Sequence, residues 1–408
     1  MTTVGIIGGG ASGLVAAICA ARGGAKVTLI ERQNRIGKKI LVTGNGRCNL
    51  THTKVTKERF HTHSEADYFK PIERINQEDT LTFFKELGIE LLIENAKIYP
   101  ASEQANSILD VMRLELEQLG VEMIVEEKIV ALETQSTQLT VKSETGRVWH
   151  FDRLIMATGG LAAPKLGCDE TGYELLQGLG HKLEPTYPTL VHILSSTPYC
   201  KMMKGTRVKG EVAIYVKGKK KRSEYGEVLF TEDGLSGPSI FQLSRIAAKC
   251  QMEKQACEIK LDLFREETED SLVTKLYDRI GRHPYKTIEE LFIGWLHKRV
   301  AIPVIKQAGI GSPIAPCENL DYEMIVELAK SMKGLVFNVT GTRGYPFAQA
   351  TAGGINLKDI NLETMQSKYD NRLYVVGEVL DVDGDCGGFN LQWAWSTGML
   401  AGQHVASY

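Results

Sequence analysis

The stretch Val4-Gly5-Ile6-Ile7-Gly8-Gly9-Gly10-Ala11-Ser12-Gly13 decides the fold of this chain. Gly8, Gly10 and Gly13 have the GxGxxG spacing. In that motif the first glycine permits a tight turn, the second lets the backbone approach a pyrophosphate, and the third lets a helix pack closely on a sheet. The free N–H groups and the positive dipole end of the following helix suit phosphate oxygens. We therefore predict a phosphate-binding loop.

The surroundings of this loop complete a βαβ unit. An apolar β-type run precedes it, residues 14–22 are helical in character, and a second β-type run over residues 26–30 ends on Glu31. A carboxylate at this position can accept hydrogen bonds from both ribose hydroxyls of a dinucleotide, and it disfavours a 2′-phosphate. The alternative is a purely structural glycine turn. The order of strand, helix, strand and acid favours dinucleotide binding.

The composition is that of a globular protein with more than one domain. The chain has 408 residues, of which 43% are hydrophobic and 24% charged, and its formal net charge is −2. This length predicts two or three domains. The charge does not indicate nucleic acid as a partner.

Cysteine usage and the absence of long apolar stretches bear on location. The eight cysteines form no CxxC pair and have no metal-ligand spacing with histidines, so we expect no metal site and a reducing compartment. No apolar stretch reaches the roughly 18 residues that a membrane helix needs, and the first strand leaves no room for a signal peptide. We expect a cytoplasmic protein that acts on a small molecule, without a membrane partner.

The pattern along the chain predicts an α/β nucleotide-binding domain that two insertions interrupt. Short continuous apolar runs, such as residues 154–156 and 373–376, are typical of strands in a parallel sheet covered on both faces. We assign residues 1–188 and 346–408 to this domain. Short β-type runs dominate residues 189–263 and 334–345. Residues 264–333 are helical in pattern, with helices expected over 271–280, 288–298 and 322–332.

A second glycine-rich segment indicates which dinucleotide is bound. Tyr374-Val375-Val376-Gly377-Glu378 has the pattern of a strand that runs into glycine and an acid, and Gly388 precedes an expected helix. A carboxylate such as Glu378 can bond the hydroxyls of a ribityl chain. The N-terminus of a helix at residues 388–391 can stabilise a flavin ring that becomes negative on reduction. The alternative is a structural turn. The two ends of the chain together favour FAD over NAD.

Several long motifs are similar to those of one family of bacterial flavoproteins. They are residues 37–51 (GKKILVTGNGRCNLT), 157–160 (ATGG), 226–231 (GEVLFT), 234–238 (GLSGP), 351–354 (TAGG), 364–368 (TMQSK) and 377–392 (GEVLDVDGDCGGFNLQ). On these motifs the chain resembles the HI0933-like family, also called the BaiN or aminoacetone-oxidase-like family. The resemblance implies a glutathione-reductase-type, Rossmann-like FAD-binding domain interrupted by a small β-barrel insert and a helical insert. The chain departs from the family at Thr51-His52 and over residues 166–173, which bears on substrate choice.

The expected site residues gather in these motifs. Arg47 is expected to neutralise the pyrophosphate and Asn49 to bond the flavin edge; the alternative is a rigid loop with a solvated arginine. The resemblance implies that Val130 bonds adenine through its backbone. The full set expected to bind cofactor is Gly8, Gly10, Ala11, Ser12, Gly13, Glu31, Arg32, Lys38, Lys39, Gly46, Arg47, Cys48, Asn49, Val130, Thr158, Gly159, Gly160, Thr351, Gly353, Gly377, Glu378, Gly388, Phe389, Asn390 and Leu391. Catalytic residues stay unassigned, with Gln349, Gln392 and Asn390 as candidates.

Flavin chemistry narrows the expected reaction to hydride transfer through N5. The sequence has no second GxGxxG βαβ unit, so NADH or NADPH is expected to bind only transiently. The leading hypothesis is NAD(P)H-linked reduction of a small organic substrate, with a conjugated C=C bond as the resemblance implies. Two alternatives stay open: oxidation of a small amine such as aminoacetone, and a non-catalytic flavin-bound module that binds RNA or protein. The substrate and the oligomeric state are left open.

Overall fold

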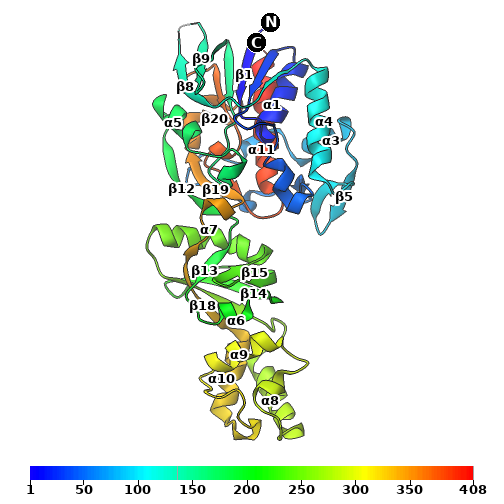
Figure 1. The fold of residues 1–408 in the computed structure, drawn as a ribbon, viewed down its shortest axis with the longest axis vertical. Helices are drawn as coiled ribbons and strands as arrows, with labels where there is room; N and C mark the ends of the chain where they lie inside the picture. The colour runs from blue at the N-terminus through cyan, green and yellow to red at the C-terminus, as the bar shows by residue number, and fades with distance from the viewer. Residues whose placement is uncertain (136, 408) are drawn as a thin grey trace. The chain divides into compact units, whose positions relative to one another are not determined.

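The computed structural model describes residues 1–135 and 137–407, and it divides into two compact units. The first comprises Met1–Pro188 and Tyr345–Tyr408, and we call it the Rossmann unit. The second comprises Thr189–Gly344, and we call it the barrel unit. Figure 1 labels the helices and strands of both units. The chain leaves the Rossmann unit once and returns to it once.

A seven-stranded sheet forms the centre of the Rossmann unit. Its order is β20 (Ile360–Asn361), β21 (Gln366–Ser367), β22 (Leu373–Val375), β11 (Arg153–Met156), β1 (Thr3–Ile7), β2 (Lys26–Ile30) and β7 (Glu122–Ile124). The five strands from β22 to β7 are parallel, whereas β20 and β21 form an antiparallel edge. Ile6 lies level with Ile155 and Leu29, and all three are fully buried. The predicted α/β class with a parallel sheet is confirmed.

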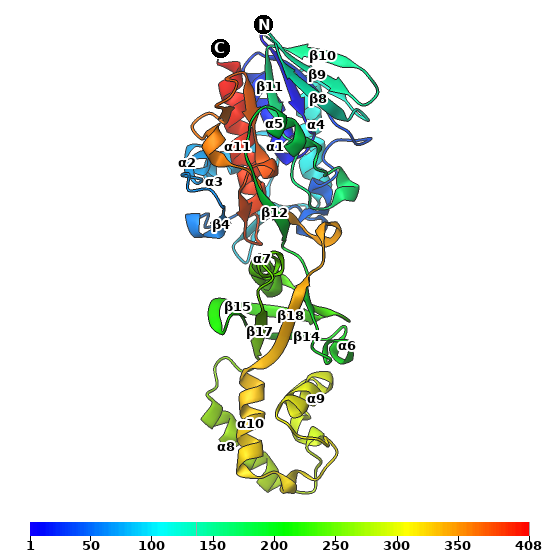
Figure 2. The same ribbon diagram turned by 90° about the vertical axis from the view of Figure 1, so that its left-hand side faces the viewer.

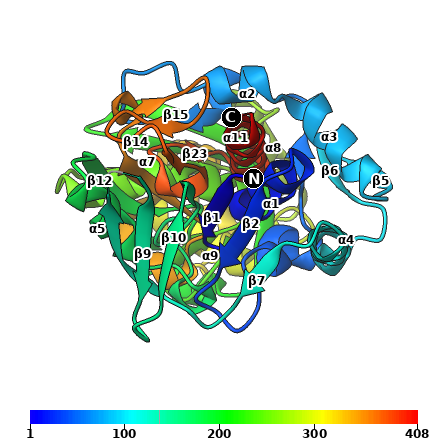
Figure 3. The ribbon, with the colours of Figure 1, turned by 90° about the horizontal axis from the view of Figure 1, so that it is seen from above.

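Two helices from opposite ends of the chain pack against each other in this unit. α1 (Ala11–Arg22) and α11 (Phe389–Ala406) lie side by side in Figure 3. A Cβ at Gly398 would lie 2.3 Å from the carbonyl oxygen of Ser12, and one at Gly402 would lie 2.5 Å from that of Ala16. Glycine therefore permits this close approach, and the two helices run in the same direction. Because α11 begins nine residues before Gly398 and α1 begins one residue before Ser12, the N-terminus of α11 lies about 12 Å beyond that of α1, at 1.5 Å per residue.

The other elements of the Rossmann unit cover the main sheet or form small sheets beside it. The helices are α2 (Lys70–Arg74), α3 (Gln77–Glu86), α4 (Ala105–Gln118) and α5 (Thr171–Gly178). The small sheets are β8 (Ile129–Thr134) with β9 (Leu139–Ser143) and β10 (Val148–Phe151), β3 (Thr51–His52) with β6 (Lys97–Pro100) and β5 (Leu91–Glu94), β12 (Leu183–Thr189) with β19 (Ala350–Ile355), and β4 (Phe60–His61) with β23 (Asp383–Gly384).

A closed barrel of six antiparallel strands forms the core of the barrel unit (Figure 2). Its order is β13 (Ile193–Ser195), β16 (Gly234–Ser236), β15 (Lys219–Phe230), β14 (Arg207–Val216), β17 (Cys257–Asp262) and β18 (Leu335–Thr342), with β18 pairing back onto β13. A two-residue turn at Lys217 and Gly218, both with positive φ, joins β14 to β15. Two further helices, α6 (Cys200–Met203) and α7 (Pro238–Met252), belong to this unit. The predicted β-barrel insert is confirmed.

Helices between β17 and β18 share the hydrophobic core of the barrel. They are α8 (Glu269–Arg282), α9 (Lys298–Gln307) and α10 (Tyr322–Lys333), and buried side chains such as Leu276 and Leu328 belong to the same cluster as Phe337 of β18. The prediction of a helix over 288–298 is wrong. Glu289–Phe292 forms only a 3₁₀ turn, and Gly294, with φ of +76°, takes the backbone out of the helical region before α9 begins.

Across the described residues, no helix combines the length and the apolar character that crossing a bilayer requires.

Candidate cofactor and active site

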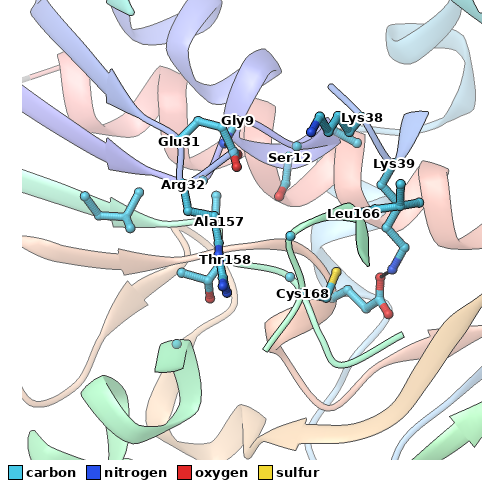
Figure 4. A pocket seen from close by; sticks show the side chains of 18 of the residues that line it. Gly9, Ser12, Glu31, Arg32, Lys38, Lys39, Ala157, Thr158, Leu166 and Cys168 are labelled. Carbon is cyan, nitrogen blue, oxygen red and sulfur yellow. Dashed lines mark hydrogen bonds and ion pairs between the residues drawn. The ribbon is translucent and has the colours of Figure 1, made fainter. Parts of the chain in front are cut away.

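A cavity open to solvent lies in the Rossmann unit at the carboxyl ends of β1, β2 and β11 (Figure 4). The first residues of α1 and α11 and the segment after β11 complete its wall. The crevice outside the carboxyl ends of parallel strands is the usual cofactor position in open α/β sheets.

About half of the expected site residues line this cavity. From the expected cofactor set they are Gly8, Gly10, Ala11, Ser12, Glu31, Arg32, Lys38, Lys39, Thr158, Gly159, Glu378, Asn390 and Leu391. Asn390 and Gln349 of the catalytic candidates line it as well. The structure thus brings residues from both ends of the chain into one cavity.

The three motif glycines occupy three different environments. Gly8 has φ of +109°, and a Cβ there would lie 2.3 Å from the carbonyl oxygen of Ala157. A Cβ at Gly13 would lie 2.0 Å from the carbonyl oxygen of Gly8. A Cβ at Gly10 would meet no atom within 4 Å, although Gly10 lines the cavity. Gly8 and Gly13 are therefore required by the fold, whereas Gly10 keeps space for a ligand.

Glu31 holds the glycine loop to the end of β2. Its Oε2 accepts a hydrogen bond from the N–H of Gly9 at 2.8 Å, and its Oε1 accepts one from the N–H of Gln33 at 2.7 Å. Burial raises the pKa of Glu31, and these amide bonds and nearby cations only partly oppose the shift. Each carboxylate oxygen keeps further lone-pair capacity toward the cavity.

A salt bridge crosses the cavity wall between Lys39 and Glu378. Lys39 Nζ lies 2.7 Å from Glu378 Oε2, and the N–H of Thr351 donates to Glu378 Oε1 at 2.9 Å. Burial opposes the charge on Lys39, but the neighbouring Glu378 carboxylate outweighs it and the pKa of Lys39 is raised. Figure 4 shows Lys39 extending toward Cys168, whose thiol pKa is raised by burial. Lys38 instead donates to the side chain of Gln33 at 2.7 Å.

Several charged residues at the cavity had no signal in the sequence motifs. Arg32 and Lys128 both pair with Asp169, which lies in the segment that departs from the family pattern. Arg35, Lys128, Cys168 and Asp169 all line the cavity. In the sequence, Arg35 follows β2, Lys128 precedes β8, and Asp169 follows β11. Because ligands bind where parallel strands end, these positions could have indicated the residues as site candidates.

The start of α11 forms the other end of the cavity. Gly388 caps the helix with φ of +94°, and Asn390 and Leu391 line the cavity. Asn390 is fixed by Gly384: its Oδ1 accepts from the N–H of Gly384 at 2.9 Å, and its Nδ2 donates to the carbonyl oxygen of Gly384 at 2.8 Å. The side chain of Asn390 is therefore a positioning element, and the helical N–H groups are the free donors.

Arg47 does not line the cavity, although residues 37–40 and Thr43 of the same loop do. Its guanidinium bonds the carboxylates of Glu94 and Glu103 and lies 4.1 Å from the ring centroid of Tyr99. The structure therefore does not bring Arg47 to a pyrophosphate in the cavity. Burial raises the pKa of the Cys48 thiol to about 12, as in a packed core. Asn49 is buried, and its Oδ1 has no hydrogen-bond partner among the described residues.

Gln392 lies in the core and not in the cavity. It is fully buried, its Oε1 accepts from Thr51 Oγ1 at 2.6 Å, and its Nε2 donates to Thr80 Oγ1 at 2.8 Å and to Ser396 Oγ at 3.0 Å. This arrangement leaves Gln392 no group to offer a substrate. Gln349, by contrast, faces the cavity.

The remaining expected residues lie outside the cavity lining, as neighbours of it or in the nearby loops. Val130 directly follows Ile129, which lines the cavity. The register of β8 and β9 shifts between Ile129 and Ala131, so Val130 has no partner residue on β9. A Cβ at Gly377 would lie 2.4 Å from Ser12 Oγ, and one at Gly160 would lie 2.6 Å from Thr351 Oγ1. The residues placed in this way are Gly13, Gly46, Arg47, Cys48, Asn49, Val130, Gly160, Thr351, Gly353, Gly377, Gly388, Phe389 and Gln392.

The described residues fit an extended dinucleotide. Thr158 lines the cavity, and its Oγ1 is buried with no hydrogen-bond partner among them. Gly10 leaves space for a phosphate, and the two helix N-termini can each face a negative group. Their offset of about 12 Å along the helix axes, from the helical rise, suits a pyrophosphate at one end and a flavin ring at the other.

Comparisons with known proteins agree with this geometry. The family model described as HI0933-like protein Rossmann domain matches residues 2–404. A 3-dehydro-bile acid delta(4,6)-reductase of Clostridium scindens is 36% identical over 410 residues, which cover 100% of this chain and 99% of that protein. A ribosomal RNA dihydrouridine synthase of Haemophilus influenzae is 27% identical over 397 residues, which cover 96% of this chain and 95% of that protein.

A solved structure supports the fold alone. A 3-ketosteroid-Δ4-(5α)-dehydrogenase from Rhodococcus jostii RHA1 matches with a TM-score of 0.50 at 16% identity, covering 99% of this chain and 96% of that chain. Together with the family match over nearly the whole chain, these findings decide what the motifs could only suggest. The chain belongs to the HI0933-like family, and it is an FAD-dependent oxidoreductase.

Proposed function

We propose that this protein reduces a ring C=C bond conjugated with a carbonyl group, taking electrons from NADH or NADPH. The full-length likeness to the bile acid reductase, at 36% identity, carries the proposal. A Δ4,6-unsaturated 3-dehydro steroid and the uracil ring of RNA share one chemical feature, which is such a bond. The more similar relative is named for a free steroid-like molecule, and a net charge of −2 gives this chain no general attraction to a polyanion. We therefore take a steroid-like enone as the substrate.

The cavity offers FAD a defined path. The N–H groups at Gly10 and Ser12 would hold the pyrophosphate, Glu31 the adenosine ribose, and Glu378 the ribityl chain. The N-terminus of α11 at Asn390 would face the ring. When bound, the flavin supplies hydride chemistry at N5. The chain itself would hold the cofactor and place positive helix ends near its negative groups.

NADH or NADPH is expected to bind next to the flavin ring only transiently. The sequence contains one GxGxxG βαβ unit, at residues 8–13, and the cavity is built around it. A second dinucleotide held throughout the cycle would need its own loop of this kind. A transient donor, exchanged with the enone at the same ring, fits a chain with one such loop.

Stopped-flow spectroscopy of the purified holoprotein tests this function. We expect anaerobic NADH or NADPH to bleach the flavin, and a 3-oxo-4,6-diene bile acid to restore its absorbance and leave with two more hydrogens. The matched control is the saturated 3-oxo bile acid, which cannot accept a hydride at a conjugated carbon. Bleaching by small amines with release of peroxide would instead indicate an oxidase. Reoxidation by uridine in RNA, but not by the diene, would assign the other substrate class. A flavin that no metabolite reduces would overturn the proposal.

A further inference from the structure

Three side chains outside the cavity lining form a hydrogen-bonded chain in the Rossmann unit. Asp381 Oδ1 lies 2.9 Å from His63 Nδ1, and His63 Nε2 lies 3.2 Å from the hydroxyl of Tyr187. The rings of His63 and Tyr187 meet edge to face, with centroids 5.7 Å apart. Asp381 and Tyr187 are buried, and the side chain of His63 is 20% exposed. A carboxylate, an imidazole and a phenol in this order can pass a proton along a line.

The carboxylate fixes the orientation of the imidazole. Asp381 Oδ2 accepts hydrogen bonds from the hydroxyl of Thr62 at 2.9 Å and from the backbone N–H groups of His63 at 2.8 Å and Ser64 at 3.0 Å. A carboxylate only accepts hydrogen bonds, so Nδ1 of His63 carries the proton that faces it. Nε2 is thereby directed at Tyr187. Such a partner sets the tautomer and the angle of a histidine.

The strand that carries Tyr187 borders the cavity wall. The N–H of Asn356 in the segment after β19 bonds the carbonyl oxygen of Lys182 before β12 at 2.8 Å, and Gly353 of β19 presses against the carbonyl of Pro185. Residues 182 and 185 therefore lie opposite residues 356 and 353, so β12 and β19 run antiparallel. In this register Tyr187 lies opposite Thr351. Thr351 bonds Glu378 of the cavity lining, and Gln349 lines the cavity two residues earlier.

The other members of the chain are tied to the start of α11. Asp381 follows Glu378 by three residues in the same loop. β4, which precedes His63, pairs with β23, and Gly384 of β23 is bonded to Asn390 at the first turn of α11. The three side chains thus belong to the segments that surround the end of the cavity where we place the flavin ring.

We propose that Tyr187 donates the proton that completes reduction of the enone, with His63 and Asp381 as positioning and relay residues. This inference rests on the proposed function. The reduced cofactor, when bound, would supply the hydride for a new C–H bond at the carbon β to the carbonyl, and the π electrons of the C=C bond would move to the α-carbon. That carbon takes the proton of the Tyr187 hydroxyl. The phenolate then regains a proton from solvent through His63. Nε2 of His63 takes a solvent proton, which gives a transient imidazolium whose Nδ1–H stays on Asp381, and Nε2 passes that proton to the phenolate.

Tyr187→Phe separates this role from packing, and Tyr374→Phe is its matched control. Tyr374 is also buried and also bonds an imidazole, with its hydroxyl 2.9 Å from His404 Nδ1. The holoproteins are reduced with dithionite without oxygen and mixed with a 3-oxo-4,6-diene bile acid. We expect Tyr374→Phe to reoxidise like the wild type. We expect Tyr187→Phe to retain its flavin and to reoxidise about 10²–10⁴-fold more slowly, the usual effect of losing a general acid.

Deuterium placement gives a readout that a structural role would not change. In D₂O the wild type should deliver deuterium to one face of the α-carbon, whereas the residual product of Tyr187→Phe should carry it on both faces, as NMR resolves. If Tyr187→Phe matches Tyr374→Phe in rate and stereochemistry, the inference is overturned and the proposed function stands. If the reduced wild type is not reoxidised by the diene, the proposed function falls and this inference falls with it.

His63→Gln keeps the test decisive if Tyr187→Phe loses its flavin. Glutamine can still bond the phenol but cannot relay a proton. We expect its single-turnover reoxidation to stay near the wild-type rate, because the first proton is already on Tyr187, while the steady-state rate falls at least tenfold. A steady-state rate equal to that of the wild type would overturn the relay.

Discussion

Lys39 and Glu378 form an ion pair with 2.7 Å between Nζ and Oε2, although they are 339 positions apart in the sequence. Lys39 follows the glycine loop and Glu378 precedes α11, so this pair joins the two ends of the cavity wall. Glu378 also accepts from the N–H of Thr351. The pair therefore fixes the carboxylate that we assign to the ribityl chain.

Lys39→Met should lower both stability and FAD affinity, because it leaves the Glu378 carboxylate without its counter-charge. Breaking a fully buried pair costs roughly 3–5 kcal/mol, and for this partly exposed pair we expect a loss of about 2 kcal/mol in the free energy of unfolding. Urea unfolding and fluorescence titration of deflavinated protein with FAD measure the two effects. Lys38→Met is the control, since Lys38 bonds the neutral Gln33, and should cost about 0.5 kcal/mol or less. Equal losses in the two variants would contradict the role of the pair.

Gly10→Ala should reduce FAD affinity without destabilising the protein. A Cβ at Gly10 meets no atom within 4 Å in the fold, yet it would enter the space that we assign to the pyrophosphate. We expect at least a tenfold rise in the FAD dissociation constant, with an unchanged unfolding midpoint for the deflavinated protein. Gly281→Ala in α8 is the control, because its Cβ also meets nothing and lies outside the cavity lining. If Gly10→Ala binds FAD as tightly as the wild type does, the assignment of the pyrophosphate to the space beside Gly10 is wrong.

The two glutamine candidates should separate into a structural and a functional residue. Gln392→Ala removes partners from the buried hydroxyls of Thr51 and Thr80, and an unsatisfied buried group costs about 1–3 kcal/mol. We expect unfolding at lower urea and no specific effect on the enone. Gln349→Ala should leave the urea midpoint unchanged and slow reoxidation of the reduced flavin by the enone. The reverse pattern would contradict the positions that the structure gives them.

Acid should weaken the Rossmann unit through buried histidines, of which His181 is the most enclosed. Its Nδ1 bonds the carbonyl oxygen of Leu176 at 2.9 Å, Nε2 lies 2.8 Å from Ser367 Oγ, and burial lowers the pKa of His181. A lowered pKa means that the unfolded chain binds the proton more tightly than the folded one. The contribution of neutral His181 to the free energy of unfolding should therefore be complete above about pH 6.5, which is the pKa of histidine in an unfolded chain. This contribution should be lost as the pH falls from there toward the lower pKa of the folded state.

His181→Gln should flatten this dependence below about pH 6.5. Burial also lowers the pKa of His52, His192 and His404, so a smaller slope should persist. Urea unfolding of the wild type and of His181→Gln at a series of pH values measures the two slopes. An unchanged slope in His181→Gln would exclude His181 as a source of the acid sensitivity.

Sequence patterns predicted those parts of the site that depend on neighbours along the chain. Gly8, Gly10 and Gly13 lie in one turn, and Glu31 ends the next strand, so spacing alone indicated their arrangement. The site residues near the C-terminus could be predicted in the same way, since Glu378 ends a β-type run and Asn390 begins a helix. In both cases backbone geometry, and not a distant partner, places the residue.

Residues whose role depends on distant partners could not be placed in this way. Arg47 carries the charge that a pyrophosphate needs, but Glu94 and Glu103 from elsewhere in the sequence bind it. Gln392 lies on a helix that is buried on nearly every side, so no polar face distinguished a core glutamine from a cavity residue. His63 meets Asp381 across 318 positions, and no local pattern relates the two.

The order in which the chain is made gives the discontinuous Rossmann unit a particular folding problem. The barrel unit, Thr189–Gly344, is one continuous stretch, so all of it is synthesised before β22 and α11. Domains generally fold as units during synthesis. The apolar faces of α1 and β11 must therefore wait, unpaired, while a complete neighbouring unit folds. Nascent chains stalled before residue 373 should consequently contain a folded barrel and recruit chaperones to their first 188 residues.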